Sequence, residues 1–427
     1  MDEGSAAGDR RGSRFMSSPH KAAAVLLTAW TIGGCAAGPP ASDLATRPPV
    51  RELVSPTAMS PVRPEIATVP PIGSTPTVRG PTATAPSSNL PACSQTATIE
   101  LGTMELAIVA EWDGDEDVYL IRGDGSDLRQ FTDNPGWDTG PVWTKDGQQL
   151  AFVIDGLTAP RAHISAADGS EGHVVAPELE VTTVRVDLSP NGDLVAFRNL
   201  EDLYVVNTLT GEQTLLTPGA DINPSNPRFS PAGTKLLFTA DSANGDDDDL
   251  FVVNSDGTGL TKLTSVVKSV HRPAWHPTED KILFEQRIPG EGIALHVVGL
   301  DGVVEKLPIV PKYRASSAAW SPDGNMIGYI FRLFGVDSQG ESVEKNSLHI
   351  ATADGIVDLE VVKPPDEPDA ELRLHELAWA PDSRHIAYTT VTEGRTDLFV
   401  LDICDGSSLL IAEDVDFYST PSWRPLP

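Results

Sequence analysis

The sequence of 427 residues contains little cysteine and little aromatic side chain, with three Cys and 6 % Phe, Trp and Tyr. Three cysteines exclude both a disulfide-dense scaffold and a cysteine-rich zinc site. No apolar run reaches the ~18 residues that a membrane-spanning helix needs. Positive charge is also scarce, since 31 basic residues face 61 acidic ones. Residues 96–427 alone carry a net charge of −32, and a body so acidic repels phosphate backbones, so we expect no nucleic-acid partner.

Familiar catalytic signatures are missing as well. The sequence has no Gly-x-Ser-x-Gly motif, no phosphate-binding loop and no His-Glu-x-x-His motif, and no hydrolase-like segment follows its repeats. His271 and His276 lie five residues apart on one expected strand and point to opposite faces, so they cannot grip one metal together. His296 and His349 replace the Tyr or Phe of other repeats, which favours structural roles. We therefore expect no catalytic residues, no metal site and no cofactor.

The N-terminal region carries an export signal. Eleven apolar residues, Ala22 to Ile32, follow Lys21 and lead into Gly33-Gly34-Cys35. This arrangement is typical of a secretory signal peptide. It resembles the lipobox of bacterial lipoproteins, which implies cleavage before Cys35, diacylation of that residue and stable membrane tethering. Residues 1–35 are therefore predicted to be a lipoprotein signal peptide, with Met1 or Met16 as the start, and the mature protein to face the periplasm or the cell exterior.

Residues 36–95 have the composition of a tether. Their 60 positions include 13 Pro and 14 Ser or Thr but no aromatic residue. Such a segment cannot bury enough apolar surface to fold, and repeated Pro favours extended polyproline II. We expect a disordered linker that holds a folded head, residues 96–427, away from the membrane.

The head is built from repeats. An apolar anchor recurs at intervals of 45, 41, 46, 45, 59 and 44 residues, at Trp143, Leu188, Phe229, Trp275, Trp320, Trp379 and Trp423. Pro stands two positions after six of these anchors, and an apolar pair such as Ala151-Phe152 stands eight and nine positions after most of them. The turn residues between the anchor and the pair, such as Ser321-Pro322-Asp323-Gly324, predict a tight connection between antiparallel strands.

A second element repeats between the anchors. It reads like Asp202-Leu-Tyr-Val-Val or Asp249-Leu-Phe-Val-Val, and a Gly turn such as Asp256-Gly257 follows it before a short fourth strand. Each unit is therefore four short antiparallel strands, as in a propeller blade. Three strands without an anchor precede the first unit, and the last anchor has no strands after it. These fragments predict an all-β propeller of seven blades whose last blade is closed by both termini, with six blades as the alternative.

The unit Trp-Ser-Pro-Asp-Gly, the apolar pair, Leu-Phe-Val-Val-Asn-Ser-Asp-Gly and Leu-Thr resemble the WD-like repeat of TolB-type propellers over residues 99–427. The resemblance implies the fold and a partner-binding role in the cell envelope. Such propellers also occur as gating domains of prolyl oligopeptidases and in oligogalacturonate lyases. The residues by which TolB proteins dock their partners are not recognisable here, and a tether replaces their N-terminal α/β domain, so the resemblance does not extend to a role in the Tol system.

The links before the anchors are the candidate binding face. In a propeller, the links between successive blades lie on one face around the channel, and Arg and aromatic residues are enriched where proteins bind partners. The residues of these types in the links are Trp137, Arg185, His271, Arg272, Tyr313, Arg314, Arg373, His375 and Tyr418. Two readings remain open: the face binds a protein partner or an acidic ligand, or these residues pack loops and pair with neighbouring acids.

Two acidic runs and two cysteines complete the candidates. The runs Asp113–Asp117 and Asp246–Asp249 offer the carboxylates that calcium prefers, but both occupy the loop before a third strand, where solvated Asp-rich turns are expected. Neither run continues as an EF-hand loop. With Cys35 lipidated, Cys93 and Cys404 remain as an even pair, and a disulfide between them is expected to staple the ring near its seam.

These observations predict an exported, lipid-anchored propeller with a monomeric head that binds an envelope protein or glycan without catalysis. The alternative is a propeller lyase or hydrolase, such as one with an oligogalacturonate-lyase-like metal site, whose active site lies in the central channel.

Overall fold

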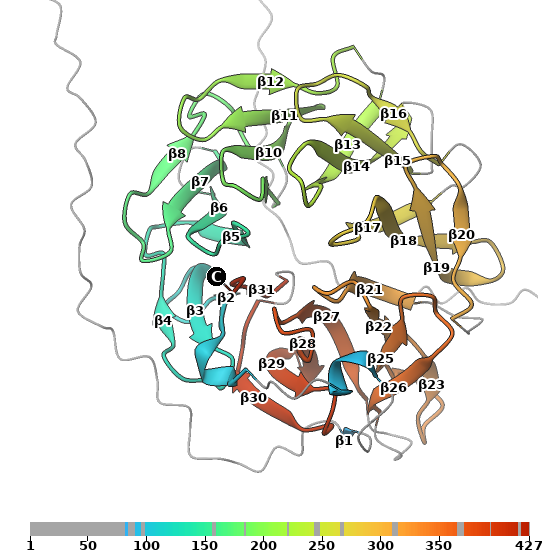
Figure 1. Cartoon of the computed structure of the whole chain (residues 1–427). Coiled ribbons are helices and arrows are strands. Elements are labelled where there is room, and N and C mark those ends of the chain that lie inside the picture. The colour runs from blue at the N-terminus through green and yellow to red at the C-terminus, as the bar shows by residue number, and fades with distance from the viewer. Residues whose placement is uncertain are drawn as a thin grey trace, which may run out of the picture. The chain divides into compact units, whose positions relative to one another are not determined.

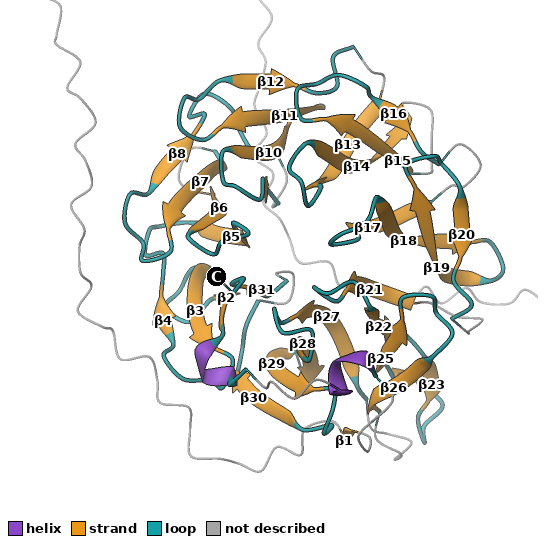
Figure 2. Ribbon diagram, in the orientation of Figure 1, coloured by secondary structure: helices purple, strands orange, loops and turns teal. Residues whose placement is uncertain are grey.

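The computed structural model describes residues 82–83, 90–94 and 99–426, with gaps at 156–158, 183–184, 220–221, 243–247, 265–268, 310–314, 365–370, 393 and 417–419. The expected signal peptide, Cys35 and most of the expected tether lie outside the described residues. The regular secondary structure of the described part is almost entirely strand, with two short 3₁₀ helices at Pro91–Ser94 and Leu101–Thr103 (Figure 2). None of the helices among these residues has the length and hydrophobicity that crossing a membrane requires.

Seven antiparallel sheets are arranged in a ring around a common centre (Figure 1), as the repeats predict. We number the blades by the order of their innermost strands along the chain. Blade 1 consists of β5 (Trp137–Trp143), β6 (Gln149–Asp155), β7 (Arg161–Ala166) and β8 (His173–Val175). Blade 2 consists of β9 (Asp187–Leu188), β10 (Leu194–Asn199), β11 (Asp202–Asn207) and β12 (Gln213–Leu215). Blade 3 consists of β13 (Ile222–Phe229), β14 (Lys235–Ser242), β15 (Asp249–Asn254) and β16 (Thr261–Lys262).

Blades 4 to 6 follow the same pattern. Blade 4 consists of β17 (Val270–Trp275), β18 (Lys281–Ile288), β19 (Gly292–Gly299) and β20 (Val304–Lys306). Blade 5 consists of β21 (Ala315–Trp320), β22 (Met326–Phe331), β25 (Ser347–Thr352) and β26 (Asp358–Lys363). Blade 6 consists of β27 (Arg373–Trp379), β28 (His385–Thr392), β29 (Arg395–Asp402) and β30 (Ser408–Ala412). Blade 5 has two additions: the hairpin of β23 (Phe334–Val336) and β24 (Ser342–Glu344), and the outer strand β1 (Thr82–Ala83), which pairs with β26.

Blade 7 closes the ring with both ends of the head. Its innermost strand is β31 (Ser422–Trp423), and its other strands are β2 (Glu105–Ala110), β3 (Asp117–Arg122) and β4 (Arg129–Gln130). The register pairs Leu106 with Trp423. This closure leaves no open array of blades with an unpaired edge at each end. The prediction of a seventh blade made from two fragments is confirmed.

The seven anchors hold neighbouring blades together. Each anchor ends the innermost strand of its blade, so the repeat in the sequence marks the inner layer of the core. The indole N–H of four anchors donates to the carbonyl one position before the anchor of the preceding blade: Trp143 to Ser422 (3.1 Å), Trp275 to Arg228 (3.1 Å), Trp379 to Ala319 (3.2 Å) and Trp423 to Ala378 (3.1 Å). These bonds fix the spacing of the blades, and the first one crosses the seam.

Most of the apolar core lies between adjacent blades. Leu250 and Val252 of blade 3, for example, form one buried cluster with Ile282 and Phe284 of blade 4. Both faces of each sheet are therefore covered, which explains the nearly continuous burial of strands such as β2 and β3. The histidines of the third strands belong to this packing, since His296 stacks on Phe284 with ring centroids 5.4 Å apart.

The end of the expected tether docks on the propeller. Leu90 and Ala92 are buried in the core cluster of blades 5 and 6, and Cys93 forms a disulfide with Cys404 across 311 positions of sequence. Residues 82–83 pair with β26, so contacts with the head also lie before residue 96, where the composition places its start. The reason is physical, because buried apolar side chains and a covalent bond hold Leu90, Ala92 and Cys93 against an existing core.

Candidate functional site at the channel mouth

The links between blades and the loops between second and third strands share one face. In a four-stranded meander successive connections alternate between the two ends of the strands, so the link into each innermost strand lies on the same side as the loop between the second and third strands. The innermost strands lie nearest the centre of the ring in Figure 1, and we call this centre the channel. The start of each innermost strand and the link before it therefore lie on one face, which we call the channel mouth.

A β-bulge recurs three residues before the anchors. The register shifts there in the inner pairs of blades 1, 3, 4, 5 and 6. In four of these blades the extra residue has a positive φ, at Gly140 (64°), Asn226 (52°), Arg272 (47°) and Ser317 (55°). Pro follows three of them, and it suits this place because a bulge position lacks a ladder bond for a backbone N–H to make. A bulge re-aims the side chain of its extra residue.

The third position before each anchor supplies a ring of inner residues: Gly140, Arg185, Asn226, Arg272, Ser317, Glu376 and Thr420. The guanidinium of Arg272 in blade 4 donates to both carboxylate oxygens of Glu376 in blade 6, at 3.1 and 2.9 Å, and to the hydroxyl of Ser317 in blade 5 at 2.9 Å. Thr420 of blade 7 donates to the same carboxylate at 3.2 Å. Four blades are thus joined by one polar cluster at the channel.

A buried carboxyl lies behind this cluster. Glu285 of blade 4 is buried and accepts a hydrogen bond from the backbone N–H of Ala318 at 3.3 Å. Burial raises the pKa of Glu285 to about 7, although the positive charge of Arg272 acts in the opposite direction. The polar cluster therefore gains a group that changes its charge near neutral pH.

A cavity of about 710 Å³ opens beside the cluster and is lined by blades 7, 1, 2 and 3. Its apolar wall consists of Pro141, Val142, Val153, Pro160, Val181 and Val186. Arg185 and Arg228 line it together with the carboxylates of Glu116, Asp155, Glu180 and Asp416. Trp137 also lines it and is 58 % exposed. The size and the mixture of an apolar wall with a few charged groups are typical of a ligand-binding pocket.

Two guanidinium groups of this cavity influence each other. Burial lowers the pKa of Arg185, and the nearby charges of Arg228 and Arg272 lower it further, while Glu376 opposes them. Arg228 lies 3.5 Å from the carboxylate of Asp187, whose pKa burial raises to about 6. Arg185 and Arg228 therefore form a local positive spot on the cavity wall, which favours an anionic group on a ligand.

Negatively charged side chains also line the cavity. Burial raises the pKa of Glu116, and the neighbouring carboxylates Asp416 and Glu111 raise it further. The cavity therefore has carboxylates as well as guanidiniums on its wall, and it can receive a ligand with an anionic group, an apolar part and a hydrogen-bond donor.

The residues that the sequence proposes for the binding face lie in different surroundings in the structure. Trp137 and Arg185 meet in the cavity, while Arg272 and the ring of His375 (3.8 Å) both approach Glu376. His271 is exposed at 4.0 Å from Asp248, and Arg373 pairs with Glu371 at 2.9 Å. Tyr313, Arg314 and Tyr418 lie outside the described residues.

Charged residues of this site that lie outside the predicted set include Arg228, Glu376, Glu116 and Asp416. A signal for Glu376 is present in the sequence, since it holds the third position before its anchor just as Arg185 and Arg272 do. Arg228 and Glu116 carry no such signal, because the register of the bulge and the depth of the loop decide where these side chains lie.

Comparison with known proteins finds relatives that share the repeats. Residues 83–278 match the family model described as the TolB beta propeller domain. The Tol-Pal system protein TolB of Bordetella pertussis is 28 % identical over 164 residues, which cover 38 % of this chain and 36 % of that protein. The match therefore spans about a third of the length of such curated relatives.

Solved structures share the fold at low sequence identity. An oligogalacturonate lyase from Vibrio parahaemolyticus is 15 % identical with a TM-score of 0.55, covering 70 % of this chain and 86 % of that chain. A puromycin-hydrolyzing peptidase of Mycobacterium tuberculosis is 16 % identical with a TM-score of 0.51, covering 79 % and 57 %. At these identities the likeness concerns the fold alone.

Proposed function

Since the chain carries a TolB-type β-propeller, we propose that it is a non-catalytic binding module of the cell envelope whose channel mouth receives a segment of another envelope protein. The relatives named as Tol-Pal system proteins support an envelope role. The proposal includes export and lipid attachment at Cys35, for which the support is the lipobox-like sequence Ile32-Gly33-Gly34-Cys35. The Pro-rich segment that follows would give the head its reach.

The observation that carries this proposal is the cavity between blades 7, 1, 2 and 3. Trp137 is a large aromatic side chain left exposed at the cavity, and such residues anchor partners at binding surfaces. Arg185 and Arg228 lie at the same cavity, and an arginine fork binds a carboxylate by two parallel hydrogen bonds. The ligand with the best fit is an extended peptide that carries an acidic group next to an apolar side chain.

Affinity capture from an envelope fraction tests the proposal. The full chain is compared with the variant Trp137→Ala/Arg185→Ala, and each protein captured by the wild type is then measured with the purified chain. We expect the double variant to weaken the direct affinity at least about a hundredfold, since two residues of the anchoring type are each worth ~2 kcal/mol.

Leu209→Ala provides the matched control. Leu209 is 82 % exposed and lies in the turn between the third and fourth strands of blade 2, which the alternation of connections places on the opposite face. This variant should bind like the wild type. Equal binding by all three proteins would reject the cavity as the site.

A further inference from the structure

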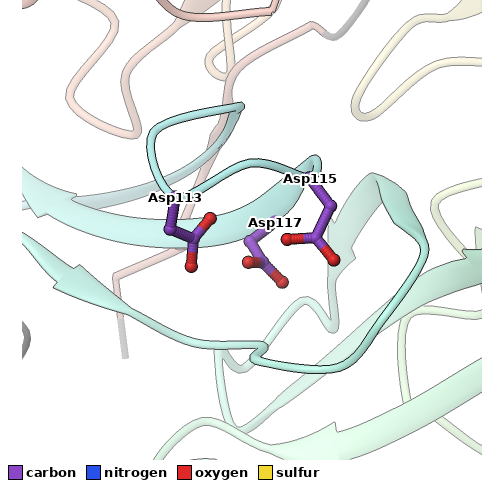
Figure 3. Close-up of side chains that lie close together, drawn as sticks. All are labelled: Asp113, Asp115 and Asp117. Atoms are coloured by element: carbon purple, nitrogen blue, oxygen red, sulfur yellow. The ribbon is translucent and has the colours of Figure 1, made fainter.

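The loop between β2 and β3 presents three aspartates at alternate positions, Asp113, Asp115 and Asp117. Each contributes a carboxylate oxygen, and these oxygens lie within 4.8 Å of one another. Figure 3 shows the three side chains gathered around a common space. Asp117 is buried, whereas Asp113 is exposed, so the group extends from the blade to the surface.

A fourth carboxylate, from the neighbouring blade, lies against this loop. Asp138 of β5 has no exposed surface, and its Oδ1 has no hydrogen-bond partner, while its Oδ2 accepts from the amide of Asn134 at 2.6 Å. The backbone N–H of Asp138 donates to the carbonyl of Glu116 at 2.7 Å. Glu116 lies between Asp115 and Asp117 in the loop, so this bond holds Asp138 against the loop. An unpaired carboxylate oxygen in a buried position is costly unless a cation or a proton compensates it.

The donors around these carboxylates are neutral. The amide of Gln130 donates to Asp113 at 2.7 Å and to Asp117 at 2.8 Å, and the hydroxyl of Thr132 donates to Asp117 at 2.9 Å. Among the described residues, no Lys or Arg forms a salt bridge with Asp113, Asp115, Asp117 or Asp138. Burial raises the pKa of Asp117 to about 7 and that of Asp138 to about 6, and each group is raised further by neighbouring acids.

Blade 3 shows how a positive charge neutralises the aspartate that is equivalent to Asp117. Asp249 starts its third strand as Asp117 does in blade 7, and its carboxylate lies 2.5 Å from the ammonium of Lys262 on β16. Lys262 pairs with Phe251 in the ladder, and Gln130 pairs with Tyr119 at the equivalent place in blade 7. Where blade 3 supplies the positive charge of Lys262, blade 7 therefore supplies the neutral amide of Gln130.

We propose that Asp113, Asp115 and Asp117 bind a calcium ion in this loop of blade 7, with the buried carboxylate of Asp138 in blade 1 adding negative charge beside it. Clustered carboxylate oxygens with no nitrogen or sulfur ligand suit a hard cation, and the irregular loop suits the flexible coordination of calcium better than the strict octahedron of magnesium. Glu116, which lies between two of these ligands, and Trp137, which precedes Asp138, line the cavity at the channel mouth. The ion therefore fixes one wall of that cavity.

Metal titration of the full chain tests this site. After chelation and dialysis, terbium is added as a luminescent substitute for calcium, with Trp112 and Trp137 as the neighbouring sensitisers, and calcium is then added as the competitor. We expect saturable terbium luminescence, its displacement by calcium, and a calcium-dependent rise of the thermal midpoint.

Two variants locate the ion. Gln130→Lys supplies the charge that blade 3 already has, and Asp113→Asn/Asp115→Asn removes two exposed or half-exposed ligands without touching the buried Asp117. Both should weaken calcium affinity at least about tenfold, because affinity follows the number of charged ligands. Asp168→Asn, in an exposed turn of blade 1, is the matched control and should bind like the wild type.

Circular dichroism and the thermal midpoint in chelator show that each variant is folded. Gln130→Lys should be as stable without calcium as the wild type is with it. Wild-type protein without saturable terbium or calcium binding would overturn the proposal, as would unchanged affinity in Gln130→Lys and Asp113→Asn/Asp115→Asn, which would place the ion elsewhere.

Discussion

At the scale of single residues, blade 6 contains a buried charged network next to the disulfide. The Nδ1 of His385 lies 2.6 Å from Asp382, and its Nε2 lies 3.6 Å from Asp402. Arg384 pairs with Asp402 at 2.6 Å, and the backbone N–H of Cys404 donates to the same carboxylate at 2.8 Å. Burial alone would lower the pKa of His385, but the two carboxylates overcome it and raise the pKa to about 9.

This network predicts a loss of stability at alkaline pH. Because the folded pKa of His385 lies above its unfolded value, the protonated imidazole stabilises the fold fully below pH ~6.5, and the effect disappears as the pH rises through about 9. The expected loss is roughly 3 kcal/mol in the free energy of unfolding. Denaturant titrations at pH 6 and 10 should show this loss in the wild type and a smaller one in His385→Gln.

His271→Gln is the control for that measurement, since His271 is exposed at the channel face and should leave the pH dependence unchanged. Other buried acids, Glu285 and Asp187 among them, titrate in the same range, so the difference between wild type and variant is the quantity that isolates His385. An identical pH profile in His385→Gln would show that the network does not hold the charged imidazole.

At the scale of elements, the innermost strand decides both packing and site. Its last residue is the anchor, and its bulge three positions earlier turns a side chain to the channel. The anchors are evident from the sequence because burial demands a large apolar residue at this position in every blade. The bulge is not, because a single extra residue shifts the register without altering the apolar pattern. The sequence therefore marks Arg272 and Arg185 as candidates in the links before the anchors, but it does not mark Glu376, which the structure shows as the partner of Arg272.

Blade 5 shows what the longest repeat interval means. The 59 residues between Trp320 and Trp379 exceed the other intervals because β23 and β24 form an extra hairpin between the second and third strands. Leu333, Phe334 and Val336 leave apolar surface exposed on this hairpin. The length of the interval indicates an insertion, but nothing in the sequence specifies that it folds as a hairpin at this face.

The indole hydrogen bonds between blades give a prediction with an internal control. Trp379 donates to the carbonyl of Ala319, but the Nε1 of Trp320 is buried without a partner. Trp379→Phe should therefore destabilise the protein by about 1 kcal/mol more than Trp320→Phe, since both lose a similar area and one also loses a hydrogen bond. Chemical denaturation of the two variants measures this difference, and equal losses would deny the indole bonds a role in holding blades together.

At the scale of the whole molecule, the ring is closed in two places. The strand pairing of β2 with β31 joins the ends of the head, and the disulfide between Cys93 and Cys404 ties the segment before the head to blade 6. The repeats predict seven blades because the fragments at each end complete one unit. Composition does not predict that residues 82–83 pair with β26 or that Leu90 and Ala92 pack on blades 5 and 6, because Pro and Thr content describes an isolated chain and not one beside an apolar core.

The disulfide gives a prediction about the whole chain. Cys93→Ser/Cys404→Ser should lower the free energy of unfolding by roughly 4 kcal/mol, since the bond closes a very long loop of the unfolded chain. Mass spectrometry of unreduced peptides should recover Cys93 and Cys404 as one linked pair. Two free thiols in protein purified from an oxidising compartment would contradict this closure.

The net charge of −32 on residues 96–427 is a property of the whole molecule. Against this negative background, the guanidinium groups at the channel mouth are local positive charges. A long-range field of this sign repels acidic partners in general and leaves Arg185 and Arg228 as the local place to receive one. Specificity would then come from the fit of the cavity and not from overall charge.

Site-specific photo-crosslinking at Trp137 tests the binding role of the channel mouth most directly. A photoreactive residue replaces Trp137 in the full chain in its own cells, and a second chain carries it at Leu209 on the opposite face. We expect a discrete adduct with an envelope protein from position 137, lost when Arg185→Glu/Arg228→Glu is added, and none from position 209. No adduct from position 137, or the same adduct from both positions, would contradict the account.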